Sequence, residues 1–128
     1  MKPELERQTT KDLLLSKGYK PLTKVELLEL ISNTTVCGDY EYSGHRKYKS
    51  FMNANGEMNG KNDWGSYEEG NYTIDEDGHL SVAWDGYWEE WTGVAFKVAN
   101  EIKFYDTNSG IWRTTFNNIT KGEQSLAI

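Results

Sequence analysis

Four aromatic residues crowd one short stretch of the sequence, around the dipeptide Asp85-Gly86. They are Trp84, Tyr87, Trp88 and Trp91. Aromatic rings stack on sugar rings and on apolar ligands, so this stretch predicts a ligand-binding platform. The structural alternative is that Trp84 and Trp91 belong to the core while the other two cover the end of a strand. Because Trp88 precedes Glu89-Glu90 in an expected turn, we expect Trp88 to be exposed.

Acidic residues occur in three adjacent groups that invite comparison with a glycoside hydrolase: Glu68-Glu69, Asp75-Glu76-Asp77 and Glu89-Glu90. Such enzymes need two carboxylates that face each other across about 5 to 9 Å, one with a raised pKa. Adjacent residues of a strand point to opposite faces, so each pair supplies at most one inward carboxylate. We interpret the groups as solvated strand ends, and the segment Asp75 to Gly78 as a turn rather than a calcium loop, because it lacks the full series of EF-hand ligands.

The single cysteine could act as a nucleophile with a histidine as its base. Cys37 would then pair with His45 or His79, the two histidines of the chain. A lone cysteine on a strand is more often a small buried apolar residue, and two imidazoles without a clear third ligand do not predict a metal site. We therefore expect no catalytic residue, no metal and no cofactor, and a protein that is not an enzyme.

The charge balance restricts the partners. Fourteen basic residues stand against 20 acidic ones in 128 residues, a formal net charge of −6. Nucleic acid and anionic lipid both attract a basic face, so neither is expected as a partner, and no stretch approaches the roughly 18 apolar residues of a membrane span. An acidic surface would instead speed association with a basic target protein.

The composition changes sharply near residue 35, within what we expect to be one domain of residues 1–128. Leucines concentrate before that point, and aromatic residues and glycines after it, which predicts a helical segment over 1–32. One helix is expected from Glu4 to Lys17. A second begins at the capping box Thr23-Lys24-Val25-Glu26, and at about ten residues it needs a surface on which to pack.

Residues 34–118 show alternating apolar positions, with turn signals such as Asn55-Gly56 and Asp77-Gly78 every eight to twelve residues. This rhythm predicts a mainly β fold, an antiparallel meander of about eight strands. A meander buries its apolar face and removes its edges by closing into a small barrel, and a two-sheet sandwich is the alternative. Residues 119–128 are expected to form a tail, which lacks a strand pattern from Lys121 and should fray there.

The order of these motifs resembles a family of small, mostly exported bacterial proteins of unknown function with a lipocalin-like barrel. The matching pieces lie between Pro21 and Tyr105: Leu22-Thr23-Lys24-Val25-Glu26-Leu27, Thr35-Val36-Cys37-Gly38, Phe51 with Asn55-Gly56, Gly70-Asn71-Tyr72-Thr73-Ile74, Asp77-Gly78-His79-Leu80 and Val82-Ala83-Trp84. Many members of the family have a disulfide-bonded cysteine where this chain has Ser81, and here no second cysteine exists. The resemblance implies the barrel and no established activity.

The cellular location follows from the resemblance rather than from the first residues. Met1-Lys2-Pro3-Glu4 has no signal-peptide pattern, which fits a cytoplasmic protein and equally a mature exported chain. The family implies the second, a periplasmic or secreted protein.

Three classes of function remain. The leading hypothesis is a non-enzymatic binding module, which holds a small apolar or aromatic-stacking ligand, or a protein partner, at the open end of the barrel. The alternative is an acidic inhibitor or immunity-type protein that binds a basic target protein. The third is an enzyme without a recognisable motif.

Overall fold

The computed structural model describes residues 10–40 and 47–126, which form two short helices and eight strands. The helices are α2 (Lys11–Ser16) and α3 (Lys24–Ile31). The strands are β1 (Thr34–Tyr40), β2 (Lys47–Met52), β3 (Glu57–Asn62), β4 (Tyr67–Ile74), β5 (Leu80–Trp84), β6 (Trp91–Val98), β7 (Glu101–Asp106) and β8 (Trp112–Lys121).

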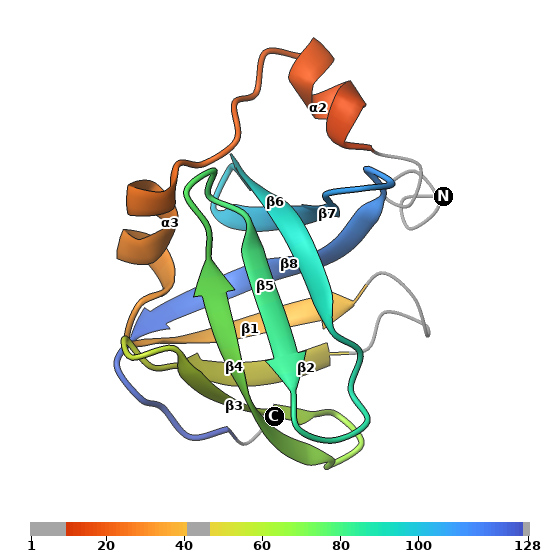
Figure 1. The fold of residues 1–128 in the computed structure, drawn as a ribbon. Helices are drawn as coiled ribbons and strands as arrows, with labels where there is room; N and C mark the ends of the chain where they lie inside the picture. Colours follow the sequence, from red (N-terminus) through yellow and green to blue (C-terminus); the bar gives the residue numbers. More distant parts are fainter. Residues whose placement is uncertain (1–9, 41–46, 127–128) are drawn as a thin grey trace.

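The strands form a closed antiparallel barrel in which each pairs with its neighbour in sequence (Figure 1). The pairing of β1 with β8 closes the ring, from Thr35 opposite Thr120 to Tyr40 opposite Thr114. This closure confirms the predicted meander barrel over the two-sheet sandwich. The predicted turns at Asn55-Gly56 and Asp77-Gly78 also link strands as expected, β2 to β3 and β4 to β5.

Helix α3 packs at one end of the barrel. Its capping box is complete: Thr23 Oγ1 accepts a hydrogen bond from Glu26 N–H at 3.2 Å, and Glu26 Oε1 accepts one from Thr23 N–H at 2.8 Å. Leu27 and Ile31 are fully buried in the main core. The segment before the helix also contacts the barrel, because Leu22 N–H donates to the carbonyl of Ala95 at 2.8 Å. This end of the barrel is closed.

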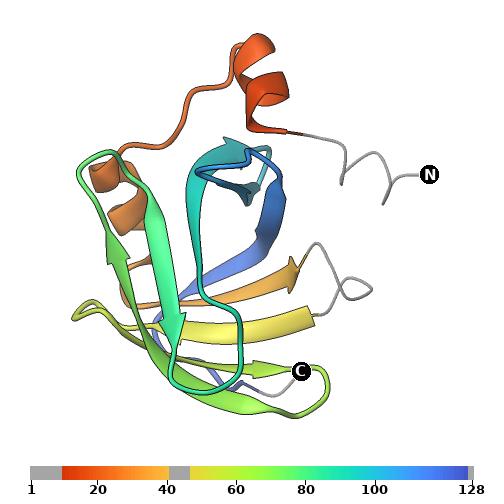
Figure 2. The same ribbon diagram turned by 45° about the vertical axis from the view of Figure 1, so that its right-hand side comes forward.

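Helix α2 covers part of the outer wall instead of the interior (Figure 2). Its one buried residue, Leu14, packs in a second apolar cluster with Val94, Phe96, Tyr105 and Trp112 of β6, β7 and β8. The helix begins after Thr10, whose hydroxyl accepts a hydrogen bond from Leu13 N–H. The start predicted at Glu4 lies outside the described residues. No helix in the described part of the chain has the length and apolarity that a membrane crossing requires.

The C-terminal strand is longer than predicted. β8 continues to Lys121, three residues beyond the expected end of the β body at 118. The segment that follows is attached to the wall: Gly122 carbonyl accepts from Thr35 Oγ1 at 2.8 Å, and Gln124 N–H donates to the same hydroxyl at 3.0 Å. The expected start of the tail at residue 119 is therefore wrong, and the segment expected to fray from Lys121 is bonded to β1 as far as Gln124 through polar contacts.

Candidate functional site

At the end of the barrel opposite α3, the described connections are the β3–β4 turn, the β5–β6 loop and the β7–β8 turn (Figure 1). We call this end the barrel mouth, and define its rim as residues 63–66 and 85–90. The stretch of four aromatic residues predicted as a binding platform lies here. β5 ends at Trp84 and β6 begins at Trp91, so the chain leaves the sheet between them, as Asp85-Gly86 predicts.

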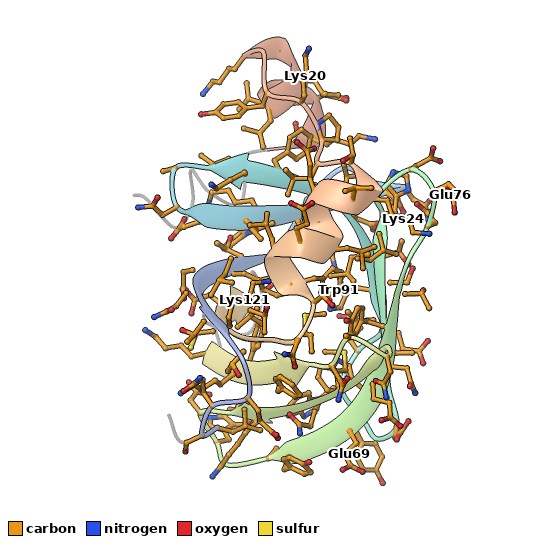
Figure 3. The ribbon with its side chains drawn as sticks, turned by 90° about the vertical axis from the view of Figure 1, so that its left-hand side faces the viewer. Lys20, Lys24, Glu69, Glu76, Trp91 and Lys121 are labelled. Carbon is orange, nitrogen blue, oxygen red and sulfur yellow. The ribbon has the colours of Figure 1, made fainter. Side chains whose placement is uncertain are left out.

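The structure separates the four aromatic residues into three environments. Trp84 and Trp91 are core residues with 6% and 8% of their surface exposed, and Trp91 lies inside the barrel (Figure 3). Trp88 is half-buried and packs against the same core. Tyr87 is fully exposed. The expectation that Trp88 is the exposed residue is thus wrong: its loop folds back over the mouth, and its neighbour Tyr87 points outward.

One carboxylate holds this loop in place. Glu68 of β4 accepts hydrogen bonds from three consecutive backbone N–H groups, those of Gly86 at 3.1 Å, Tyr87 at 2.7 Å and Trp88 at 3.0 Å. Hydrogen bonds to an ionised acceptor are stronger than those between neutral groups. Glu68 therefore acts as a clasp that fixes Trp88 over the mouth, a role that its sequence position beside Glu69 did not reveal.

A glycine provides the space into which Trp88 folds. Gly60 of β3 faces the interior, and a Cβ atom there would lie 2.9 Å from ring atoms of both Trp84 and Trp88. These two indoles meet edge to face, with ring centroids 4.7 Å apart. An isolated glycine inside a strand often marks such a close approach, so Gly60 was a signal in the sequence that the prediction did not use.

The interior beneath Trp84 is almost completely filled. The cavity there has a volume of about 10 Å³, close to that of one water molecule. Its lining residues come from six strands: Val36, Tyr48, Ser50, Met58, Val82, Trp84, Trp91 and Phe116. With the loop in this position, the cavity formed by the described residues has room for about one water molecule. A ligand must therefore bind outside the wall or displace a side chain.

Two polar atoms in this interior have no hydrogen-bond partner. Among the described residues, Trp84 Nε1 and Trp91 Nε1 are the buried side-chain nitrogens without an acceptor. Both indoles line the small cavity. A third buried indole shows the usual arrangement, because Trp112 Nε1 donates to Thr115 Oγ1 at 2.8 Å.

Among the grooves on the outer wall, two are bordered by residues of the predicted acidic groups. The larger has a volume of about 600 Å³ and runs over β4, β5 and β6. Trp91 is one of its lining residues. Arg113 and Glu89, which also line it, form an ion pair of 3.0 Å. The smaller, about 300 Å³, lies over β2, β3 and β4 and is bordered by four carboxylates: Glu57, Glu69, Asp85 and Glu123. An acidic groove of this kind also forms on solvated strands without any ligand.

The acidic groups predicted as solvated strand ends are mostly engaged in local contacts. Glu68 bonds the β5–β6 loop and Glu89 pairs with Arg113, while Glu69 and Glu90 are exposed. Glu89 and Glu90 both border the groove over β4, β5 and β6, where Glu89 pairs with Arg113.

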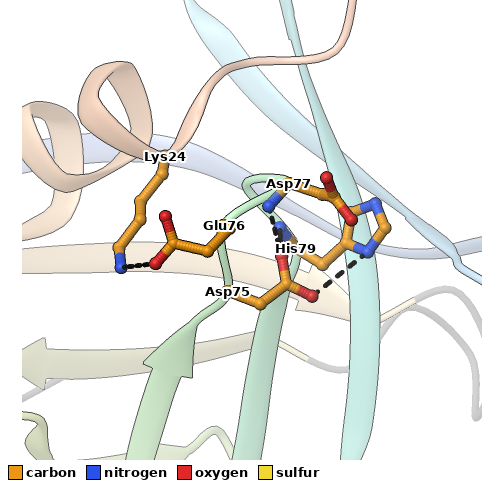
Figure 4. Close-up of polar contacts among 5 residues, drawn as sticks. All are labelled: Lys24, Asp75, Glu76, Asp77 and His79. Atoms are coloured by element: carbon orange, nitrogen blue, oxygen red, sulfur yellow. Dashed lines mark hydrogen bonds and ion pairs between the residues drawn. The ribbon is translucent and has the colours of Figure 1, made fainter.

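The segment from Asp75 to Gly78 is a turn between β4 and β5, as predicted (Figure 4). Asp75 Oδ1 accepts hydrogen bonds from the N–H groups of Asp77 at 2.9 Å and His79 at 3.0 Å. The His79 hydrogen bond is the main reason that the pKa of Asp75 lies below its ordinary value. Ligand atoms of Asp75, Asp77 and His79 lie within 4.8 Å of one another, but the two aspartates are exposed and Asp75 is committed to the turn.

Cys37 and His79, the cysteine and the histidine within the described residues, lie on different elements of the fold. Cys37 is a free, half-buried thiol on β1. The imidazole of His79 lies 3.5 Å from Asp75 at the β4–β5 turn, and His45 lies outside the described residues.

Comparison of the chain with protein-family models, with curated proteins and with solved structures finds no match.

Proposed function

We propose that this protein is a non-enzymatic binding module whose ligand enters the barrel mouth and displaces Trp88. The observation that carries this proposal is the position of Trp88, an aromatic loop residue that packs on Trp84 and is held there by the clasp of Glu68. An apolar or aromatic ligand can replace the contacts that Trp88 makes with Trp84, at the cost of an edge-to-face pair worth about 0.5–1.5 kcal/mol.

The shape of the barrel supports the mouth as the point of entry. The opposite end is closed by Leu27 and Ile31 of α3, both fully buried. The mouth is covered by a loop in which three consecutive backbone N–H groups bond one half-exposed carboxylate, that of Glu68. Local segments that depend on few contacts open at lower free energy than the strands of a core.

The engagement of the carboxylates supports binding rather than catalysis. Glu68, Asp75 and Glu89 each contact a backbone or a basic partner, which leaves them poorly placed to transfer protons to a substrate. We also propose that the chain belongs to the family of small exported bacterial barrels that its motifs resemble. A protein of the periplasm or the exterior is the expected consequence, and fractionation of the native host followed by immunoblotting tests it.

The test of the proposal compares two variants that make the same change of charge. Glu68→Gln weakens the clasp and keeps Trp88, whereas Glu90→Gln alters an exposed residue of the same loop. Tetralin, an uncharged bicyclic hydrocarbon, serves as the probe, and heteronuclear NMR follows the indole N–H signals of the five tryptophans. Opening the loop costs part of the binding free energy, so a variant that opens more easily binds more tightly.

We expect tetralin to shift the Trp88 and Trp84 signals in the wild type, and the apparent affinity to rise about threefold or more in Glu68→Gln but not in Glu90→Gln. Equal affinity in all three proteins would show that the clasp does not control access. Shifts confined to residues of the outer grooves would place the binding site outside the mouth. Either result would refute the proposal.

A second candidate function rests on the outward side of the rim. Trp64, Tyr67 and Tyr87 near the mouth are exposed to 79%, 52% and 103%, and exposed aromatic residues often anchor protein interfaces. With a net charge of −6, this surface fits a basic partner protein. At low salt, a lysine-rich peptide should shift the NMR signals of these residues. Its affinity should fall steeply at about three times the physiological ionic strength, because salt screens the attraction between exposed charges. Shifts spread over all acidic faces would refute the interface.

A further inference from the structure

The two unpaired indole nitrogens indicate what the ligand of the mouth must carry. Trp84 and Trp91 lie on adjacent strands, with Trp91 opposite Val82, two residues before Trp84 on the same face. Both side chains are more than nine-tenths buried, and both line the cavity beneath the mouth. Each has lost its hydrogen bond to water on folding, and the described residues supply no replacement.

The other polar atoms of the cavity wall are directed elsewhere. Ser50 Oγ donates to the carbonyl of Asn59 at 2.5 Å. The hydroxyl of Tyr48 bonds Thr114 Oγ1 at 2.6 Å, and Thr114 in turn donates to the carbonyl of Asp39. Of the residues that line the cavity, Trp84 and Trp91 are therefore the two whose side-chain N–H groups have no partner among the described residues. None of the lining residues carries a charge.

We propose that the ligand is an uncharged ring compound that carries a hydrogen-bond-accepting oxygen, such as a ketone, and that Trp84 Nε1–H and Trp91 Nε1–H donate to this oxygen. The inference rests on the proposed function of the mouth. One carbonyl oxygen has two lone pairs and can accept from both indoles. A carboxylate would be buried without a counter-charge in a protein of net charge −6, which disfavours an anionic ligand.

The test uses three probes built on one bicyclic ring system: tetralin, the ketone α-tetralone, and tetralin-1-carboxylate. The ketone is better hydrated than the hydrocarbon, so an apolar cavity without donors binds tetralin more tightly. Paired donors reverse this order. We expect α-tetralone to bind the wild type about tenfold more tightly than tetralin, the carboxylate to bind more weakly than either, and the ketone alone to shift the Trp84 and Trp91 indole protons to lower field.

Substitution by phenylalanine keeps an aromatic ring and removes the N–H donor. Trp84→Phe and Trp91→Phe should each reduce the preference for the ketone to about threefold or less, measured as the ratio of the two dissociation constants. Trp112→Phe is the matched control, because its indole already bonds Thr115 and packs in the outer cluster. Its ratio should equal that of the wild type. If one phenylalanine variant does not fold, the other still gives the ratio.

Three results would overturn the inference. Tighter binding of tetralin than of α-tetralone would show that the two donors do not meet the ligand. A ketone preference that survives in both Trp84→Phe and Trp91→Phe would place its origin elsewhere. Tighter binding of the carboxylate would require a positive group at the site. In each of these three cases, tetralin that binds Glu68→Gln more tightly than the wild type would still support the proposed function of the mouth. If none of the three probes binds, both the proposed function and the inference about the ligand are refuted.

Discussion

The indole of Trp88 meets the indole of Trp84 edge to face, with ring centroids 4.7 Å apart and ring planes at 72°. The two residues are four positions apart, yet they do not share the face of one strand, because β5 ends at Trp84 and the loop turns back. A loop residue has thus become part of the cover of the core. The relationship predicts that the two tryptophans differ in how much they stabilise the fold.

Removing either ring should destabilise the protein, but to different extents. Trp84→Ala empties a fully enclosed site and should lower the free energy of unfolding by about 3–5 kcal/mol. Trp88→Ala removes a half-buried ring and its contact with Trp84, and should cost about 1–2 kcal/mol. Urea denaturation followed by circular dichroism measures both values.

Tyr87→Ala is the matched control in the same loop, since Tyr87 is fully exposed and should change the stability by less than about 0.5 kcal/mol. A loss for Trp88→Ala no larger than that for Tyr87→Ala would contradict the packing of Trp88 over the mouth.

Weakening the clasp should expose Trp88 without removing it. Glu68→Ala leaves three backbone N–H groups to bond with water, so the β5–β6 loop should open more often. We expect acrylamide to quench a larger share of the tryptophan fluorescence and the stability to fall by about 1–2 kcal/mol. Glu90→Ala, an exposed site in the same loop, should leave both quantities unchanged. Identical quenching in the two variants would mean that packing alone retains Trp88.

The capping box of α3 gives a prediction at the other end of the barrel. Thr23→Ala removes the acceptor for Glu26 N–H and should cost about 0.5–2 kcal/mol, because the helix is docked through Leu27 and Ile31. Val25→Ala changes an exposed residue of the same helix and should have little effect. An unchanged urea midpoint for Thr23→Ala would show that α3 is loosely attached.

The turn between β4 and β5 gives a prediction about pH. The pKa of Asp75 is lowered mainly by the hydrogen bond from the His79 backbone N–H, with smaller contributions from Asp77, the His79 imidazole and Lys24. Since the folded pKa lies below the unfolded one, Asp75 stabilises the turn above the ordinary carboxyl pKa, and this stabilisation is lost as the pH falls through the lowered value.

NMR titration of the Asp75 carboxyl should give a midpoint below the ordinary value for an aspartate, and His79→Ala should raise it only slightly because the backbone donor remains. Full restoration of the ordinary pKa in His79→Ala would assign the effect to the imidazole instead.

Most of the fold could be predicted from local signals. The capping box at Thr23, the turn at Asn55-Gly56 and the break at Asp85-Gly86 all lie where the sequence indicates, because each depends on residues close in the chain. Ring closure was inferred because closing the meander buries its apolar face and removes its edges, and the two-sheet sandwich was the alternative. The length of β8 and the attachment of Gln124 could not be predicted, since both depend on Thr35, which is far away in the sequence.

The site was predicted as a location but not as an arrangement. The crowding of aromatic residues identified the loop, and the alternation of β5 placed Trp84 in the core. The orientation of Trp88 depends on Glu68 of β4 and on the open space at Gly60 of β3, which are contacts between strands that no local pattern encodes. The unpaired indole nitrogens likewise follow from the packing around them.

The ladder between β5 and β6 joins only three residue pairs, against five between β4 and β5 and six between β6 and β7. A ring of strands has no free edge until its weakest ladder separates. If these three pairs part, β5 and β6 become two edge strands with unsatisfied backbone groups, and such edges recruit strands from other molecules. Because Glu68 bonds the loop that connects these two strands, we expect it to oppose their separation and so to limit self-association through the sheet.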